Sequence, residues 1–238
     1  MTEHDRHWHQ VRRSKMFTAL PAALVSILAG NFLWEAVRAN VKVPVGELPW
    51  RLSVLDLPTT ANLLAVFGGL MLARAQFAKT VRPHFGYGWM QKEGDGGRWI
   101  LYFFNAGPGH ATVTQILYRI AFHGEERTGA SEWIRFPDLD ARLRRRGIEE
   151  ADAELTWIGR TPVVPQQRGV DGLKIGEFSY RALAAIGHLD VEILAEDSVG
   201  DRHRLLIRST ARLPSKATRV IDSLRAREVA DRQDAAGR

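Results

Sequence analysis

Two long runs without a charged residue dominate the first third of this 238-residue chain. The first is Met16 to Trp34, which contains 19 residues. At about 1.5 Å per residue, a helix of this length spans about 28 Å, close to the thickness of the hydrocarbon core of a bilayer. The second run is Leu57 to Ala73, 17 residues bounded by Asp56 and Arg74. The sequence therefore predicts an N-terminal hairpin of two transmembrane helices within residues 16–82.

A cleaved signal peptide is the alternative interpretation of the first run, because the basic stretch VRRSK precedes it. The apolar core of a signal peptide is usually shorter and ends at a small-residue cleavage site. Here the run ends in Phe32-Leu33-Trp34, a sequence typical of the membrane interface. We therefore interpret the run as a retained helix.

Small residues recur at every fourth position of both runs, which places them on one face of each helix. They are Thr18, Ala22, Ser26 and Gly30 in the first run, and Ala61, Ala65, Gly69 and Ala73 in the second. Such faces allow helices to pack closely in lipid, although Ala and Gly are also simply common in membrane helices. In an antiparallel hairpin, Asn31 and Asn62 lie at similar depths, so we expect their amides to hydrogen-bond to each other.

The basic residues at the ends of the runs indicate the orientation of the hairpin. Three precede the first helix and three follow the second, against three in the connecting loop: Arg12, Arg13 and Lys15; Arg74, Lys79 and Arg82; Arg38, Lys42 and Arg51. The bias is small, but the clustering favours a two-pass protein of the inner (plasma) membrane with both termini cytoplasmic. Residues 1–15 are then a cytoplasmic basic tail, and the loop between Glu35 and Asp56 is outside.

The chain after the hairpin changes to short apolar runs separated by turn residues, which is typical of a β-rich domain. We expect strands at Phe85–Gln91, Arg98–Phe104, Thr112–His123, Glu132–Phe136, Glu154–Ile158, Gly176–Tyr180, Leu189–Ala195 and Arg202–Ser209. Both faces of Arg98–Phe104 are apolar, so this strand is expected at the centre of its sheet. The predicted fold class is α+β: a membrane hairpin followed by a mainly antiparallel β-sandwich over residues 83–214 with one short inserted helix.

The stretch FNAGPGHATVTQ, which begins at Phe104, raises the question of a phosphate-binding loop. Such a loop needs a helix N-terminus after its glycines, whereas the residues that follow here form strands. We interpret Gly107-Pro108-Gly109-His110 as a type II turn between two strands, with a positive φ at Gly109. Asn105, Gly107, Pro108 and Gly109 are thus predicted to be structural residues.

The segment PDLDARLRRRG, from Pro137 to Gly147, predicts a short helix with Asp138 as N-cap and Gly147 as C-cap. Four arginines follow one another closely on it: Arg142, Arg144, Arg145 and Arg146. They could contact anionic lipid headgroups if the domain lies near the bilayer. A basic face in contact with water is the simpler interpretation and the one we favour.

Known catalytic patterns are missing from the sequence. It has no cysteine, P-loop, HExxH or GxSxG. His4, His7 and His9 could chelate a metal, but they lie in a polar tail, where contact with water is the favoured interpretation. The turn with Asp197 and Asp201 offers too few oxygens for a calcium site. His188, Asp190 and His203 could meet as acid–base partners, but no nucleophile accompanies them, and surface positions are favoured. We therefore expect no enzyme activity, no cofactor and no metal.

The segments WILYFFNAGPGHATV and LDVEILAEDSVGDRHRLLIRS carry a resemblance to a known group of proteins. They resemble the strand–loop–strand pattern and the acidic turn of immunoglobulin-like sandwich domains in uncharacterised bacterial (actinobacterial-type) membrane proteins with an N-terminal two-helix hairpin. The resemblance covers Phe85 to Leu213 and implies an immunoglobulin-like sandwich. It transfers no catalytic residues.

The expected function is that of a membrane-anchored β-sandwich that binds a partner or reports a signal without catalysis. Its expected partners are the lipid bilayer and another protein or a second copy. Nucleic acid is not expected, although the net charge is +6, because much of the excess flanks the apolar runs. The alternative is a membrane effector, similar in outline to the two-helix-plus-barrel effectors of cyclic-oligonucleotide signalling, whose β-domain binds a nucleotide. Residues 215–238 are expected to form a short helix or to be disordered.

Overall fold

A computed structural model describes residues 8–12, 15–40, 55–92, 94, 97–125, 132–165 and 172–236 of the chain. The chain divides into two compact units. One contains residues 13–80 and the other combines residues 1–12 with residues 81–238. His4, His7 and most of the predicted outer loop lie outside the described residues.

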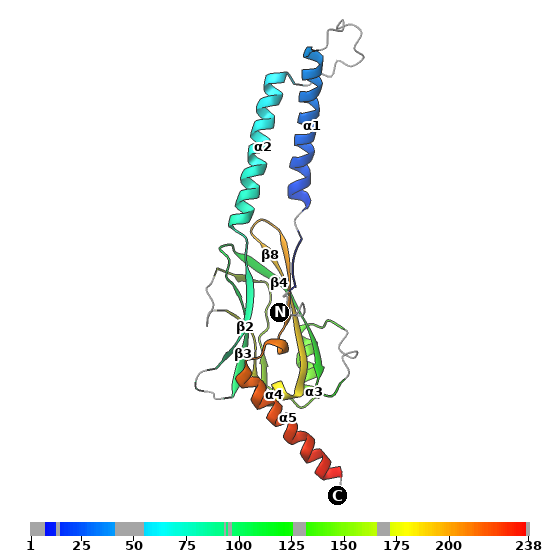
Figure 1. Ribbon diagram of the computed structural model, residues 1–238, viewed down its shortest axis with the longest axis vertical. Helices are drawn as coiled ribbons and strands as arrows, with labels where there is room; N and C mark the ends of the chain where they lie inside the picture. Colours follow the sequence, from blue (N-terminus) through cyan, green and yellow to red (C-terminus); the bar gives the residue numbers. More distant parts are fainter. Residues whose placement is uncertain are drawn as a thin grey trace. The chain divides into compact units, whose positions relative to one another are not determined.

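The smaller unit is a hairpin of two helices, α1 (Lys15–Asn40) and α2 (Leu57–Thr80), which lie side by side and run antiparallel (Figure 1). Both helices extend beyond the predicted runs, because Ala, Arg and Lys continue the helical pattern past Trp34 and Ala73. Two segments, Ala19–Arg38 and Leu57–Thr80, are long and apolar enough to cross a bilayer, and almost none of either is buried within the protein.

Asp56 caps the start of α2, as its sequence position suggests. Its Oδ1 accepts a hydrogen bond from the backbone N of Thr59 at 3.1 Å, and its carbonyl oxygen accepts one from the N of Thr60 at 2.9 Å. The first bond satisfies one of the amides that every helix leaves unpaired at its N-terminus, and the second is the first regular bond of the helix.

Of the residues predicted to pack the helices, Asn31 contacts the other helix, but with a different partner from the one predicted. Asn31 donates a hydrogen bond from Nδ2 to Oγ1 of Thr60 at 2.8 Å, and Thr60 is completely buried. Asn62 is exposed instead, so the predicted pair of Asn31 and Asn62 is wrong in this structure. Gly30, Ala65 and Gly69 are exposed as well, and no atom lies within 4 Å of a Cβ placed on either glycine.

The larger unit is built from two antiparallel sheets packed as a β-sandwich-like domain (Figure 1). The five-stranded sheet has the order β1 (Trp8–Arg12), β9 (Arg202–Arg208), β8 (Ile186–Asp197), β4 (Ala111–Phe122) and β6 (Thr161–Val163). The four-stranded sheet has the order β2 (Phe85–Gln91), β3 (Arg98–Asn105), β7 (Leu173–Ser179) and β5 (Ala153–Leu155).

Burial alternates along much of the long strands β3 and β4, which form where the sequence predicts them. In β3, Leu101 and Phe103 point inward and are fully buried, and the strand lies between β2 and β7 as expected for a central strand. Tyr118 and Ile120 do the same for β4. The opposite face of β3 is only half-buried at Ile100 and Tyr102, so its covering on both faces is incomplete.

Three predictions about strands and tails need correction. The predicted N-terminal tail contains β1, which pairs with β9 from Trp8 opposite Leu206 to Arg12 opposite Arg202. The strand predicted at Glu132–Phe136 is a single bridge at Ile134. Helix α3 begins directly after it because Pro137 is preorganised for a first helical turn. The short strand β6 was not predicted at all.

In the described part of the larger unit, three α-helices accompany the sheets, whereas the sequence predicted one inserted helix and, as one alternative, a short C-terminal helix. Helix α3 (Phe136–Arg145) buries Leu139 and Leu143 on its inner face, and Gly147 ends it with a φ of 72°. Its N-cap is Arg135 and not Asp138, which lies in the first turn. Helix α4 (Tyr180–Ala185) begins at Ser179, whose hydroxyl accepts a hydrogen bond from the N of Ala182.

The C-terminal segment, predicted as a short helix or a disordered tail, forms the 22-residue helix α5 (Ser215–Ala236), and it packs on α4. Ala217 and Ile221 are buried, and Arg225 donates hydrogen bonds to the carbonyl oxygens of Ala184 and Ile186, both at 2.9 Å. These contacts make α5 a part of the larger unit.

Candidate functional site

The turn after β3 holds the segment that connects α2 to β2. Asn105 is fully buried, and its Oδ1 accepts hydrogen bonds from the backbone N of His84 and of Gly107, both at 3.0 Å. Its Nδ2 donates to the carbonyl oxygen of Gly109. The N of Ala106 donates to the carbonyl oxygen of His84 at 2.7 Å. We call the turn 105–109 together with Val81–His84 the linker clamp.

The glycines of the linker clamp are required by close approach of the backbone. A Cβ on Gly109 would lie 1.5 Å from the carbonyl oxygen of Val81, and one on Gly107 would lie 2.5 Å from the N of His84. No side chain fits at either position without moving main chain. Gly109 has no left-handed φ, so the prediction of a type II turn is wrong. The prediction that these residues are structural stays compatible with the contacts.

An open groove with a volume of about 900 Å³ lies on the outer face of the five-stranded sheet. Four arginines line it, Arg12 of β1, Arg160, and Arg202 and Arg204 of β9, together with Gln10 and Gln115. We call this surface the arginine groove. Sequence reasoning missed it, because its lining comes from five segments, on β1, β4, β8 and β9 and directly before β6, that only the pairing of the five strands brings together.

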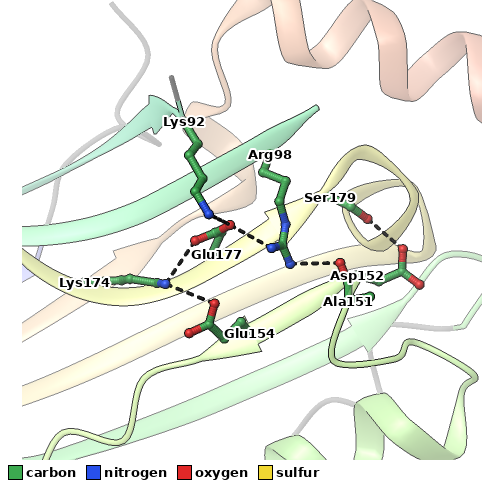
Figure 2. Close-up of polar contacts among 8 residues, drawn as sticks. All are labelled: Lys92, Arg98, Ala151, Asp152, Glu154, Lys174, Glu177 and Ser179. Atoms are coloured by element: carbon green, nitrogen blue, oxygen red, sulfur yellow. Dashed lines mark hydrogen bonds and ion pairs between the residues drawn. The ribbon is translucent and has the colours of Figure 1, made fainter. Parts of the chain in front are cut away.

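A second polar cluster covers the outer face of the four-stranded sheet, where Glu177 of β7 is surrounded by three cations (Figure 2). Nζ of Lys92, Nη1 of Arg98 and Nζ of Lys174 lie 2.9, 2.9 and 3.0 Å from its carboxylate oxygens. The Glu177 side chain is only 2% exposed. Arg98 also donates to the carbonyl oxygen of Ala151 at 2.8 Å, which ties β3 to the loop before β5 (Figure 2).

The cations keep Glu177 ionised. Burial raises the pKa of this carboxyl group, but hydrogen bonds from Lys92 and Lys174 and the charge of Arg98 outweigh burial, so its pKa lies below the usual value. A carboxylate in this state is a poor general base at neutral pH, since its affinity for a proton is low. The cluster is therefore suited to holding strands together and not to proton transfer.

The residues considered as acid–base partners do not form one group. His188 lies 2.8 Å from Asp190, which is fully buried beside Arg119. Asp190 and His203 were expected at the surface, and this expectation is wrong. His203 lies on the opposite face of the sheet, where its Nε2 is 2.9 Å from Oδ2 of the buried Asp197.

In the acidic turn after β8, backbone amides of the turn bind the side chain of Asp197. Oδ1 of Asp197 accepts hydrogen bonds from the N of Val199 at 3.0 Å and of Asp201 at 2.8 Å. Within the described ranges, no three His, Asp or Glu side chains converge as a metal site would require.

The arginines of α3 are partly engaged in local structure. Arg144 binds Oδ1 of Asp140 at 2.8 Å and the carbonyl oxygen of Ile148 at 2.9 Å. Arg146 pairs with Glu125, and Arg145 donates to the carbonyl oxygen of Ala141. Together with Arg142 they were considered for headgroup contact, and that contact stays a prediction.

No protein-family model, no curated protein and no solved structure matches this chain.

Proposed function

We propose that this chain is a two-pass protein of the inner membrane, with both termini cytoplasmic, whose sandwich binds a partner or reports a signal without catalysis. The observation that carries the proposal is the connectivity of the two units. The helices are inserted between β1 and β2 of a single domain. Both ends of the hairpin therefore start from one folded body, so a pair of spanning helices would return the chain to the side from which it left.

The linker clamp supports a role in transmitting a signal. Asn105 and Gly109 fix Val81–His84 to the sheet, and only these four residues separate the end of α2 from β2. On the other side, two residues separate β1 from α1. Short connections pass on motion better than long flexible ones. That the sandwich is immunoglobulin-like stays a prediction.

The polar clusters support binding over catalysis. Among the described residues, Glu177, Asp190 and Glu192 each contact at least one cation at hydrogen-bond distance. Engaged carboxylates of this kind stabilise a fold and leave few groups for acid–base chemistry.

Crosslinking in native membranes tests the proposal, with the full chain carrying a photoreactive residue at the exposed Trp157. A discrete adduct with a second copy or with one protein at constant stoichiometry, lost in detergent at high dilution, supports it. The matched control places the same residue at the exposed Glu150. The proposal fails if the photoreactive residue gives no adduct at position 157 or at any other exposed position of the sandwich.

A ligand-gated membrane effector is the second candidate, and the arginine groove is the observation that favours it. Such an effector would release a dye from vesicles that contain the full chain once a ligand fills the groove. An interaction module would leave the vesicles intact under the same conditions. Dye release therefore separates the two candidates.

A further inference from the structure

Cross-strand pairing in the arginine groove brings two positive charges together. Arg12 of β1 lies directly opposite Arg202 of β9 in the antiparallel register. Residues paired in this way have Cβ atoms about 5 Å apart, and like charges at such positions are destabilising. An anion between the two guanidinium groups would reduce their repulsion and so stabilise this part of the sheet.

Three arginines of the groove have no partner among the described residues; Arg12 and Arg202 lie on neighbouring strands, and Arg160 lies at the opposite edge of the sheet, directly before β6. The side chains of Arg12, Arg160 and Arg202 form no hydrogen bond or ion pair with any other described residue, and all three are exposed. Arg204 differs, because Glu192 binds its Nε and Nη2 at 2.7 and 2.8 Å. Glu196 lies opposite Arg202 on the other side. Three arginines and this one carboxylate leave a surplus of about two positive charges in the groove.

We propose that the arginine groove binds a phosphate-bearing anion through Arg12, Arg160 and Arg202. The planar guanidinium group matches two phosphate oxygens at once, and three such groups fit a ligand with several charged oxygens. The amides of Gln10 and Gln115 supply further hydrogen-bond donors at the rim. The described lining contains no Trp, Tyr or Phe on which a nucleobase could stack, so the groove recognises the phosphate groups and not the organic part of the ligand.

Such a phosphate could come from a soluble compound or from an anionic lipid headgroup. Arg12 precedes Lys15, the first residue of α1, by three positions. An extended chain of three residues spans at most about 11 Å, so Arg12 would lie near the headgroups if α1 crosses a bilayer. The inference itself rests on the sandwich and does not require that crossing, so its failure and that of the proposed function are distinguishable.

The test uses the full chain in nanodiscs of phosphatidylcholine and measures binding of tripolyphosphate, ATP and CTP by calorimetry. We expect saturable binding of all three with similar affinity. The double variant Arg12→Gln/Arg202→Gln should bind at least tenfold more weakly. Arg227→Gln, which removes an exposed arginine of α5 outside the groove, should bind as the wild type does. Because the double variant removes a like-charge pair, its thermal stability without ligand should be unchanged or higher.

Nanodiscs that contain phosphatidylglycerol distinguish the two sources. If the headgroup occupies the groove, the affinity of the wild type for tripolyphosphate falls at least tenfold, and phosphatidylglycerol raises the melting temperature of the wild type but not of the double variant. If the source is soluble, the affinity stays the same. The proposal is overturned if the double variant binds the phosphate compounds as tightly as the wild type and its melting temperature responds to phosphatidylglycerol in the same way. It is also overturned if Arg227→Gln weakens binding as much as the double variant does.

Discussion

The backbone N of His84 donates a hydrogen bond to Oδ1 of Asn105 at 3.0 Å. This bond crosses 21 positions of the chain and fixes the last residue before β2 to the end of β3. Four residues separate the end of α2 from β2, so this short segment is one of the two connections between the hairpin and the sandwich. Asn105 is therefore the residue through which we expect the two units to be coupled.

Replacing Asn105 by Ala should destabilise the larger unit by about 3 kcal/mol, because the backbone amides of His84 and of the buried Gly107, and the carbonyl oxygen of Gly109, lose their partner. Chemical unfolding of the full chain in detergent, followed by tryptophan fluorescence, measures the change. Asn62→Ala is the matched control, since Asn62 is exposed on α2, and it should change the free energy of unfolding by less than about 0.5 kcal/mol. Equal effects of both variants would contradict the role of Asn105.

Gly109→Ala should cost about 3 kcal/mol in the same assay, because the new methyl group meets the backbone of Val81, which cannot rotate away. Gly69→Ala adds the same methyl group where no atom lies within 4 Å. That variant should be neutral or slightly stabilising, since Ala favours a helix more than Gly does. A tolerated Gly109→Ala would show that the linker clamp is looser than described.

The hydrogen bond between Asn31 and Thr60 should appear as a coupling free energy between the helices. In a double-mutant cycle with Asn31→Val and Thr60→Val, we expect about 1 kcal/mol, which is typical of polar pairs between membrane helices. A cycle that pairs Asn31→Val with Asn62→Val should give a value near zero. Both coupling free energies are measured by unfolding in mixed micelles. A larger value for Asn31 with Asn62 than for Asn31 with Thr60 would support the pair predicted from the sequence.

Glu177→Gln should lower the free energy of unfolding by about 2 kcal/mol at pH 7, because it removes the negative charge that pairs with three cations. The loss is limited because water partly screens the cations. The pKa of Glu177 in the folded protein lies below its usual value. Its contribution is thus fully present above the pKa of the unfolded chain, about 4.3, and is lost as the pH falls through the folded pKa.

Thermal melts from pH 7 to pH 3 therefore test the Glu177 cluster. The difference between wild type and Glu177→Gln should shrink in acid. Glu154→Gln is the matched control, since Glu154 lies opposite Glu177 in the sheet but is 49% exposed, and it should have little effect at any pH. A pH-independent loss for Glu177→Gln would point to packing and not to charge.

Strands with clear alternation could be predicted from the sequence because burial on one face demands it. The bounds of β2 agree with the prediction, those of β3 differ by one residue at one end, and those of β4 by one residue at each end. Strands β1 and β6 could not be predicted in this way. Both lie at sheet edges, where one side needs no partner, and WHQVR and TPV carry too few apolar residues for a pattern.

Helical phase explains the error in the hairpin. Each residue turns an α-helix by about 100°, so Thr60 and Asn62 point in very different directions. A four-residue repeat of small residues identifies a face but not what covers it. The sequence does contain a start signal for α4, since Ser179 precedes a run of helix formers, and the strand predicted over Gly176–Tyr180 runs across it.

The candidate site was predicted in part. The composition of the stretch from Asn105 to Gly109 predicts a structural turn, but the segment that it contacts lies about 25 residues earlier in the chain, and no local pattern connects the two. The arginine groove depends on a pairing between residues 12 and 202. Contacts of such long range are set by the tertiary fold and leave no mark on local periodicity.

Cysteine accessibility tests the central claim, that the two helices cross a membrane as a hairpin attached to one domain. The chain has no cysteine of its own, so single cysteines at Gly46 in the connecting loop and at Asp234 in α5 can be labelled with a membrane-impermeant maleimide in intact cells. We expect labelling at position 46 in intact cells, labelling at position 234 only after permeabilisation, and retention of the protein in the membrane pellet after carbonate washing. Equal labelling at both positions, or release of the protein by carbonate, would contradict the account.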